Sequence, residues 1–213
     1  IYLAEDTWNN LRISLTNISG VFLAEGRPAK RERCLVLALD LAAQLNDKNH
    51  LFRARLYRFE QLVDTGQWAD AEAMWQQLDP MGRDWRRNLY RPGDAERIYA
   101  TYRFYKGDLT EEQLDHAEQL AKTGKNRESI RGLHNLRGRW RLGQGRYQLA
   151  AESLHEAVRM AREVGRVAAE AETQLALAKI HLDQLADPRQ EAERLANAKN
   201  PAHHPLAELW LAI

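Results

Sequence analysis

Apolar and polar residues alternate along the chain with the period of an α-helix. The clearest stretch places apolar residues at steps of four, three, four and three: Ala150, Leu154, Ala157, Ala161 and Val164. These positions fall on one face of a helix with 3.6 residues per turn. A second helical pattern precedes them, and the short turn Gln144–Arg146 joins the two. The stretch predicts an antiparallel helix pair, with the small residues Gly138 and Ala150 where the two backbones could cross closely.

Glycine recurs at a nearly constant interval between such helical stretches. Gly26, Gly66, Gly107 and Gly145 are separated by 40, 41 and 38 residues, and a fifth turn begins at Ala186, 41 residues further on. Self-similarity at a fixed period of this size is typical of repeat proteins. We predict five helical hairpins followed by a terminal helix that begins near Leu206. The hairpins cover approximately residues 7–48, 49–80, 94–124, 126–165 and 166–200.

Prolines and capping residues mark several of the expected helix ends. Pro28 suits the first turn of a helix, where its missing N–H is not needed. Thr110 and Gln113 form a capping-box pattern at the start of another helix. Asp79–Pro80 predicts the end of the fourth helix, because the residue before proline disfavours helical backbone angles. Residues 81–93 are then the longest interruption in the series.

The predicted hairpins define an all-α fold. One hairpin cannot bury its own apolar stripe, but stacked hairpins bury a continuous core. Small rotations between successive hairpins wind such a stack into an α-α superhelix with a concave inner surface. We expect residues 1–213 to form one domain of this kind. Because the chain begins with Ile1 and ends in the apolar run AELWLAI, we expect it to be a segment excised from a longer protein.

The best-formed hairpin resembles the tetratricopeptide repeat. The residues that match this pattern are Gly138, Gly145, Tyr147, Ala150, Leu154 and Ala157. His134 and Arg141 stand where the family has large aromatic residues. The period near 40 is similar to the long repeat variant of kinesin light chains and of the sensor arms of bacterial signal-transduction ATPases and maltose-regulator-type transcription factors. The resemblance implies a TPR-like solenoid whose first helices line the concave surface and bind peptides there.

Composition and charge narrow the function classes. Apolar residues make up 44% and charged residues 29% of the chain, which suits a folded helical protein. A net charge of +1 gives no electrostatic reason to bind nucleic acid or a membrane. Arg heavily outnumbers Lys, which indicates either base-composition bias or bidentate recognition of anions. Cys34 is the only cysteine and lies in an apolar helical run, so we expect a buried thiol, no intrachain disulfide and a cytoplasmic location.

The sequence contains no pattern that predicts catalysis. Phosphate-binding, dinucleotide-binding, zinc-protease and serine-hydrolase motifs are all absent from it. Glu112 and His116 are spaced to share a metal on one helix face, but a site needs three or four ligands. We therefore expect a protein that is not an enzyme and that has no cofactor and no metal.

The resemblance implies a set of groove positions on the first helices of three hairpins. The candidate binding residues are Arg53, Glu60, Arg97, Thr101, Phe104, Tyr105, Asn135 and Arg139, with Leu56 and Leu142 beside them. Arg53, Arg97 and Arg139 could form a cationic row. The alternative interpretation is that the aromatic cluster around Tyr99 and Tyr102 packs between hairpins beneath Arg side chains. Arg86, Arg87 and Arg91 precede this cluster.

These observations favour a non-enzymatic module that binds a protein or peptide, as a scaffold or sensor arm of a larger regulatory protein. A first alternative is the ligand-sensing domain of a multidomain ATPase or transcription regulator. A nucleic-acid-binding solenoid is a less favoured alternative, whose affinity would fall steeply with salt. No membrane partner is expected, because no apolar run approaches the roughly 18 residues of a membrane span.

Overall fold

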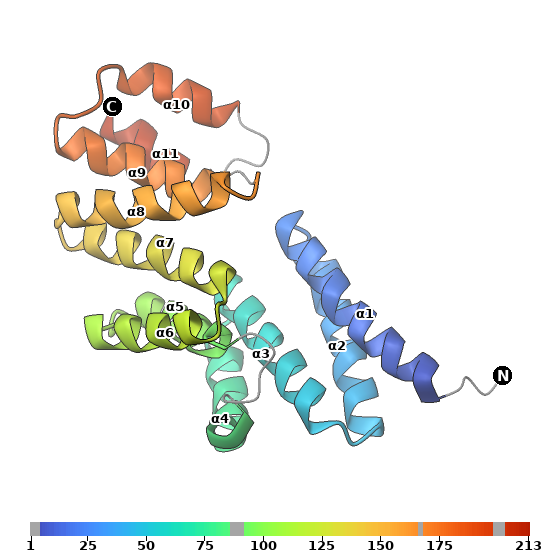
Figure 1. Cartoon of the computed structure of the whole chain (residues 1–213). Helices are drawn as coiled ribbons and strands as arrows, with labels where there is room; N and C mark the ends of the chain where they lie inside the picture. Colours follow the sequence, from blue (N-terminus) through green and yellow to red (C-terminus); the bar gives the residue numbers. More distant parts are fainter. Residues whose placement is uncertain (1–4, 86–91, 166–167, 198–202) are drawn as a thin grey trace. The chain divides into compact units, whose positions relative to one another are not determined.

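The computed structural model describes residues 5–85, 92–165, 168–197 and 203–213, and all regular structure in these ranges is α-helical (Figure 1). Eleven helices are present in the described residues: α1 Glu5–Ala24, α2 Pro28–Gln44, α3 Lys48–Asp64, α4 Trp68–Trp85, α5 Asp94–Lys106, α6 Glu111–Thr123, α7 Arg127–Gly143, α8 Tyr147–Arg162, α9 Ala169–His181, α10 Pro188–Ala196 and α11 His203–Ala212. The predicted all-α class is therefore confirmed.

The chain divides into two compact units, unit 1 up to Ile98 and unit 2 from Tyr99 onward. In unit 1 each of the helices α1 to α4 packs antiparallel on the next one in the chain, and in unit 2 the helices α6 to α11 do the same. In unit 2 the odd-numbered helices additionally contact one another, α7 with α9 and α9 with α11 (Figure 1). Sequential packing of this kind is consistent with an α-α superhelix.

The predicted hairpin turns lie where the glycine spacing placed them. Gly66 separates α3 from α4 with a φ of 71°, and Gly145 separates α7 from α8 with a φ of 72°. These angles lie in the left-handed region, which glycine adopts without the steric cost that a Cβ atom brings. The capping box is also present, because the Thr110 hydroxyl accepts from the Gln113 N–H and the Gln113 side chain accepts from the Thr110 N–H.

Helices α7 and α8 approach each other closely at Gly138 on α7. A Cβ atom built on this glycine would lie 2.4 Å from Cγ of Leu154 on α8. The predicted close crossing of these helices is present, but the side chain that fills it is Leu154. Ala150 and Ala157 are fully buried on either side of Leu154 in sequence, whereas Val164 lies beyond the end of α8 and is exposed.

Two expectations about helix ends and burial are wrong. α4 does not stop before Pro80 but continues to Trp85, so the predicted boundary of the second hairpin is too early. A proline in a helix forfeits one hydrogen bond and costs about 3 kcal/mol, which the rest of an 18-residue helix outweighs here. Cys34, expected to be buried, is only half-buried on α2.

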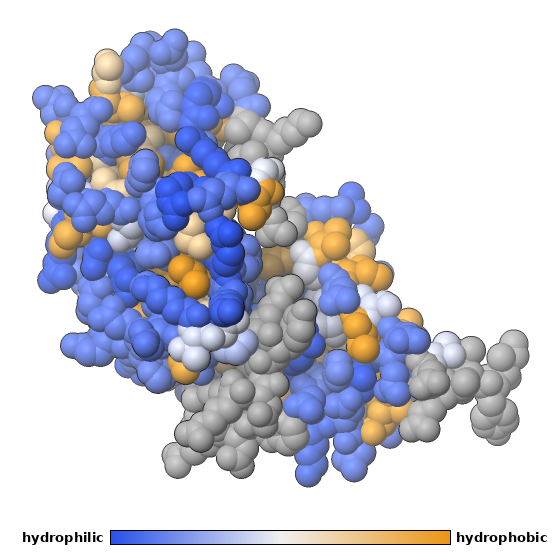
Figure 2. Space-filling model, in the orientation of Figure 1, coloured by the Kyte–Doolittle hydropathy of each residue, from blue (hydrophilic) through white to orange (hydrophobic). Residues whose placement is uncertain are grey.

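Helix α1 exposes several large apolar side chains. Apolar side chains along α1 are exposed to solvent, as Figure 2 shows: Leu11, Ile13, Ile18, Val21 and Leu23. Arg12, the only charged residue between Thr7 and Ala24, is buried and pairs with Asp47. At the other end of the chain, Leu209 of α11 is fully buried against Ala192 and Leu195, as expected for a terminal helix that covers the last hairpin.

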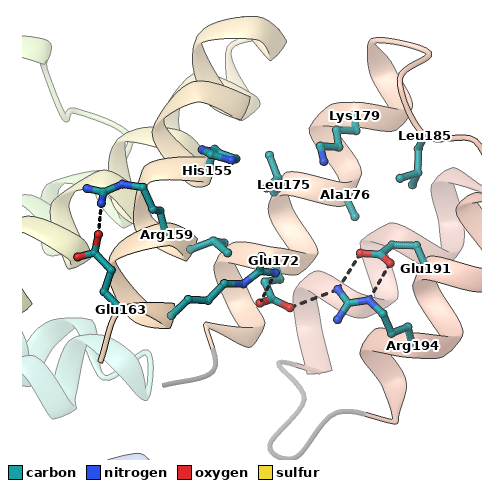
Figure 3. Close-up of a pocket in the computed structure, with 12 residues that line it drawn as sticks. His155, Arg159, Glu163, Glu172, Leu175, Ala176, Lys179, Leu185, Glu191 and Arg194 are labelled. Atoms are coloured by element: carbon teal, nitrogen blue, oxygen red, sulfur yellow. Dashed lines mark hydrogen bonds and ion pairs between the residues drawn. The ribbon is translucent and has the colours of Figure 1, made fainter. Parts of the chain in front are cut away.

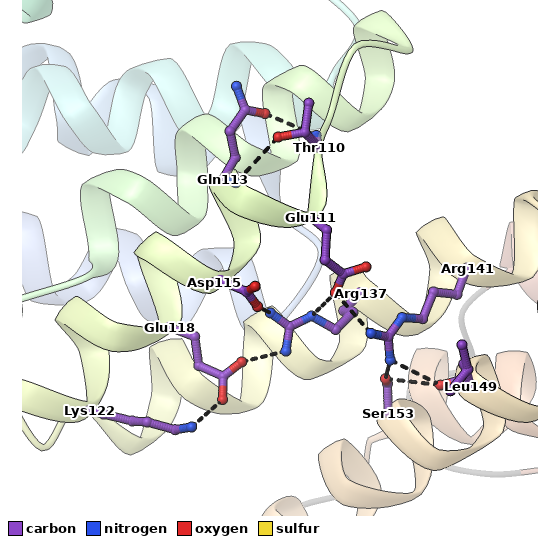
Figure 4. Close-up of polar contacts among 10 residues, drawn as sticks. All are labelled: Thr110, Glu111, Gln113, Asp115, Glu118, Lys122, Arg137, Arg141, Leu149 and Ser153. Atoms are coloured by element: carbon purple, nitrogen blue, oxygen red, sulfur yellow. Dashed lines mark hydrogen bonds and ion pairs between the residues drawn. The ribbon is translucent and has the colours of Figure 1, made fainter.

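A buried arginine joins α6 to α7 (Figure 4). Arg137, 8% exposed, donates hydrogen bonds to Asp115 (2.6 Å) and Glu118, and its guanidinium also forms an ion pair with Glu111. Arg141 pairs with the same Glu111 at 2.8 Å and donates to the Ser153 hydroxyl on α8. Arg141, which departs from the tetratricopeptide pattern, is thus part of a polar link across three helices.

Burial alone would raise the pKa of Glu118, but hydrogen bonds and charge from Lys122 and Arg137 outweigh it and hold the pKa below its usual value. The charges of this cluster balance, since three cations face three carboxylates (Figure 4). The packing of α6 on α7 therefore combines an apolar contact between Leu114, Leu133 and neighbouring side chains with a charge-paired polar network.

Candidate functional site

Polar side chains connect successive odd-numbered helices within each unit. Each contact joins residues about one repeat apart: Arg97 to Glu60 in unit 1, and Arg139 to Tyr105, Asn135 to Glu170, and Gln174 to Glu208 in unit 2. The separations are 37, 34, 35 and 34 residues in that order. We call these contacts the odd-helix ladder. In the tetratricopeptide resemblance, the odd-numbered helices are those that line the groove.

The ladder of unit 2 contains a cluster of aromatic and charged groups. Phe104 and Tyr105 at the end of α5 pack edge to face, with ring centroids 5.3 Å apart. The Arg139 guanidinium of α7 lies 5.0 Å from the Phe104 centroid and 5.7 Å from the Tyr105 centroid. Cation–π contacts at such distances hold a guanidinium against an aromatic surface.

The carboxylate of Glu170 on α9 completes this cluster. Its Oε1 lies 2.9 Å from Nη1 of Arg139, and its Oε2 accepts a hydrogen bond of 2.7 Å from Nδ2 of Asn135. Arg139 also donates a longer bond of 3.4 Å to the Tyr105 hydroxyl. We call Phe104, Tyr105, Asn135, Arg139 and Glu170 the Arg139 patch. Three helices of unit 2 contribute to it.

The Arg139 patch holds a fixed positive group and an unused acceptor. Burial alone would lower the pKa of Arg139, but the Glu170 carboxylate and Tyr105 raise it above the ordinary arginine value, so the guanidinium stays charged. The Oδ1 atom of Asn135 is buried and has no hydrogen-bond partner among the described residues. Buried acceptors are normally satisfied, so this oxygen is an unpaired acceptor within the patch.

In unit 1 the predicted residues form a different arrangement. Glu60, 13% exposed, lies between Arg31 of α2 at 2.5 Å and Arg97 of α5 at 2.7 Å. Burial would raise the pKa of Glu60, but the charges of Arg97 and Arg31 and their hydrogen bonds lower it. Arg97 is thus engaged with a carboxylate, and its pKa is raised, since the Glu60 charge outweighs the effect of burial.

The remaining predicted groove positions differ in environment. Arg53 is half-buried on α3, and Thr101 is half-buried on α5. Leu56 is a core residue, 1% exposed, so placing it in a groove is wrong. Arg53 and Arg97 belong to unit 1 and Arg139 to unit 2. Arg86, Arg87 and Arg91 lie outside the described residues.

Sequence reasoning missed two charged partners of these side chains. Glu170 was not a candidate, although it follows Asn135 by 35 residues, about one repeat, and an alignment of the hairpins on their odd helices could have found it. Arg31, the second cation on Glu60, lies on an even-numbered helix and offered no such signal. Tyr102 is buried and Tyr99 half-buried, as the packing interpretation of that aromatic pair expects.

Within the described ranges, no group of three or more His, Cys, Asp or Glu side chains is placed to hold a metal ion. None of the helices in those ranges is long and apolar enough to cross a membrane. Comparison of the chain with protein-family models, curated proteins and solved structures finds no match. The geometry of the Arg139 patch is therefore the basis for a functional proposal.

Proposed function

We propose that this chain is a TPR-like binding module, without enzymatic activity, that holds an extended peptide segment of a partner protein on the odd-numbered helices of unit 2. The module would act in the cytoplasm as a scaffold or sensor arm of a larger regulatory protein. The observation that carries the proposal is the convergence of Phe104, Tyr105, Asn135 and Arg139 from two successive odd helices.

The chemistry of the Arg139 patch suits a peptide. An asparagine amide can pair with a backbone carbonyl or a backbone N–H. Nδ2 of Asn135 already donates to Glu170, and its Oδ1 has no hydrogen-bond partner among the described residues but is buried, so the side chain would turn outward to meet a peptide. Tyr105 is 44% exposed, so its ring offers apolar surface beside a fixed guanidinium. Tyrosine and arginine are enriched among residues that dominate binding energy at protein interfaces. An aromatic side chain of the peptide would contact Tyr105 and the face of the Arg139 guanidinium, whose charge Glu170 already balances.

Selection from a random peptide library on the immobilised chain tests this proposal. The affinity of a selected peptide is then measured by calorimetry for the wild type and for Arg139→Ala. We expect Arg139→Ala to weaken binding by roughly 10-fold to 50-fold, since it removes a desolvated cation and its aromatic contacts. Asn135→Ala should weaken the same peptide by a smaller factor.

The matched control is Arg189→Ala on α10, an exposed arginine of unit 2 that has only a distant ion pair with Glu193, 3.9 Å long. This variant should bind the peptide as the wild type does. The proposal is contradicted if no peptide is selected, or if the selected peptides bind Arg139→Ala and the wild type equally while circular dichroism shows both to be folded.

The nucleic-acid alternative makes a different prediction. A solenoid that binds RNA or DNA through its arginines would lose affinity steeply as salt rises. Both Arg97 and Arg139 are paired with carboxylates, which argues against such a row of free positive charge. Titration of the chain with single-stranded RNA at low salt distinguishes the two, and tight, salt-sensitive binding would favour the nucleic-acid alternative.

A further inference from the structure

A pocket of about 390 Å³ lies between α8, α9 and α10 of unit 2 (Figure 3). On α9 the lining residues Glu172, Leu175, Ala176 and Lys179 share one helix face, because their spacing is that of helical turns. Glu170, a member of the Arg139 patch, precedes Glu172 by two residues and so projects from another side of α9. The pocket and the Arg139 patch are separate surfaces.

The floor of the pocket is apolar. Val158, Leu175 and Ala176 are buried, and Leu185 from the α9–α10 connection is partly buried beside them. Val158 and Leu175 belong to the apolar cluster between α8 and α9, whereas Ala176 and Leu185 belong to the next cluster along the chain. The floor therefore lies over the junction of two parts of the core and offers hydrocarbon surface to a bound molecule.

At one end of the pocket, two arginines contact the half-buried carboxylate of Glu172. The Glu172 side chain is 11% exposed and forms two ion pairs of 3.2 Å, with Arg162 through Oε1 and with Arg194 through Oε2. Arg194 also donates two hydrogen bonds to Glu191, of 2.7 and 2.8 Å (Figure 3). The carboxylates at this end thus already have cationic partners.

The other end of the pocket carries a cation without a partner. Lys179 projects from α9 on the side where His155 projects from α8 (Figure 3). Neither side chain forms a hydrogen bond or an ion pair with any residue in the described part of the chain. Four cations line the pocket and three carboxylates face them, which leaves one positive charge in excess: Arg159, Arg162, Lys179 and Arg194 against Glu163, Glu172 and Glu191.

The charge of Lys179 acts within the pocket. Hydrogen bonds from Arg194 are the main reason why the pKa of Glu191 lies below its usual value, and the charges of Lys179 and Arg162 lower it further. Lys179 follows Glu172 by seven residues, which is roughly 10 Å along a helix that rises about 1.5 Å per residue. Along α9, Leu175 and Ala176 therefore lie between Lys179 and Glu172.

We infer that this pocket binds a small organic anion, with its anionic group at Lys179 and its apolar body on Leu175 and Ala176. A volume of about 390 Å³ falls within the range of small-molecule sites, and the lining combines an apolar floor with charged side chains. The anionic group is a carboxylate or a phosphate, since an ammonium group pairs with either as a point charge. This inference does not depend on peptide binding at the Arg139 patch.

Two-dimensional NMR titration of the full chain with four probes tests the inference. Benzoate and phenyl phosphate combine an apolar ring with the two candidate anionic groups. Benzyl alcohol offers the ring without charge, and inorganic phosphate offers the charge without a ring. We expect benzoate or phenyl phosphate to shift resonances of residues that line the pocket, and to bind about 10-fold more tightly than benzyl alcohol or inorganic phosphate.

Substitution of the unpartnered lysine locates the anionic group. Lys179→Gln should weaken the better ring-bearing anion by about 10-fold, because a charge-assisted contact is lost. The matched control is Lys48→Gln, an exposed helical lysine of unit 1, which should leave binding unchanged.

Several results would overturn the inference. These are no shift with either ring-bearing anion at millimolar concentration, benzyl alcohol binding as tightly as benzoate, and shifts confined to the Arg139 patch. Equal affinity of Lys179→Gln and the wild type for the better ring-bearing anion would also overturn it. None of these results bears on peptide binding, which is measured with different probes and different variants.

Discussion

Gly138 provides the sharpest test of how the hairpins pack. In most helix interiors, replacing glycine by alanine stabilises a protein by roughly 0.5–1 kcal/mol, because the unfolded chain loses conformational freedom. At Gly138 the new methyl group would lie 2.4, 2.8 and 3.2 Å from three carbon atoms of the Leu154 side chain. Carbon atoms in contact normally stay about 3.5–4.0 Å apart, so α7, α8 or Leu154 must move by roughly 1 Å.

The cost of that movement exceeds the usual gain. Overpacking of a filled core costs about 1–3 kcal/mol, and Leu154 has little room to give because it is fully buried. We expect Gly138→Ala to lower the free energy of unfolding by about 0.5–2 kcal/mol after the intrinsic gain is subtracted. Gly143, the last residue of the same helix, has nothing within 4 Å of the point that an alanine methyl group would occupy. Gly143→Ala should therefore leave stability unchanged or raise it by up to about 1 kcal/mol.

The assay is urea unfolding followed by circular dichroism, together with hydrogen exchange of peptides from α7 and α8. A double-mutant cycle with Leu154→Ala isolates the clash. Leu154→Ala alone should cost about 2–5 kcal/mol through the cavity that it leaves. The double variant should be more stable than the sum of the two single effects by about 1 kcal/mol or more, because alanine at 154 removes the obstructing atoms.

The reasoning is refuted if Gly138→Ala stabilises the protein as much as Gly143→Ala does. It is also refuted if the two substitutions at 138 and 154 are additive, because independent effects would mean that the side chains do not meet. Unchanged hydrogen exchange in α7 and α8 for a destabilised Gly138→Ala would place the effect elsewhere in the molecule.

Two further predictions concern the buried charges. Arg137→Met should lower the free energy of unfolding by about 2–3 kcal/mol in urea titrations at pH 7, since the buried Glu118 keeps only its contact with Lys122 among the described residues. The surface control Arg159→Met should have no measurable effect, and equal effects would contradict the proposed role of burial. Glu60 has a lowered pKa in the folded protein, so the stability that it contributes is present above its unfolded value of about 4.5 and is lost as pH falls through the folded value. Glu60→Gln should therefore have a lower free energy of unfolding than the wild type at pH 7, and should lose less of it between about pH 5 and 3. Parallel plots of the free energy of unfolding against pH for the two proteins would disprove this.

Local features of the sequence predicted the helices and the turns well. Helical periodicity and turn glycines depend on a few neighbouring residues, so Gly66 and Gly145 marked hairpin turns correctly. Pro80 misled the prediction, because a local preference against helix was outweighed by the rest of α4. Helix boundaries are settled by the sum of many such small terms, of which a sequence pattern displays only some.

The partners of the charged side chains could not be predicted in the same way. Arg139 was a candidate, but its place against Phe104 and Glu170 depends on how far each helix rotates about its own axis. A rotation of one residue, about 100°, would redirect every side chain on that helix. The pocket at Lys179 depends on the same helix rotations and on the shortness of α10. No single stretch of the sequence therefore predicts it.

The odd-helix ladder has a consequence for how this chain can change in length. Asn135 of α7 contacts Glu170 of α9, and Arg139 of α7 contacts Tyr105 of α5. A residue inserted in α7 between Asn135 and Arg139 would rotate one of them away from its contact and interrupt the ladder there. A residue added to the exposed loop at Gly145 would leave the orientations of Asn135 and Arg139 on α7 unchanged. Insertions and deletions tolerated in evolution should therefore occur in the interhelical loops, while the odd-numbered helices keep a constant length.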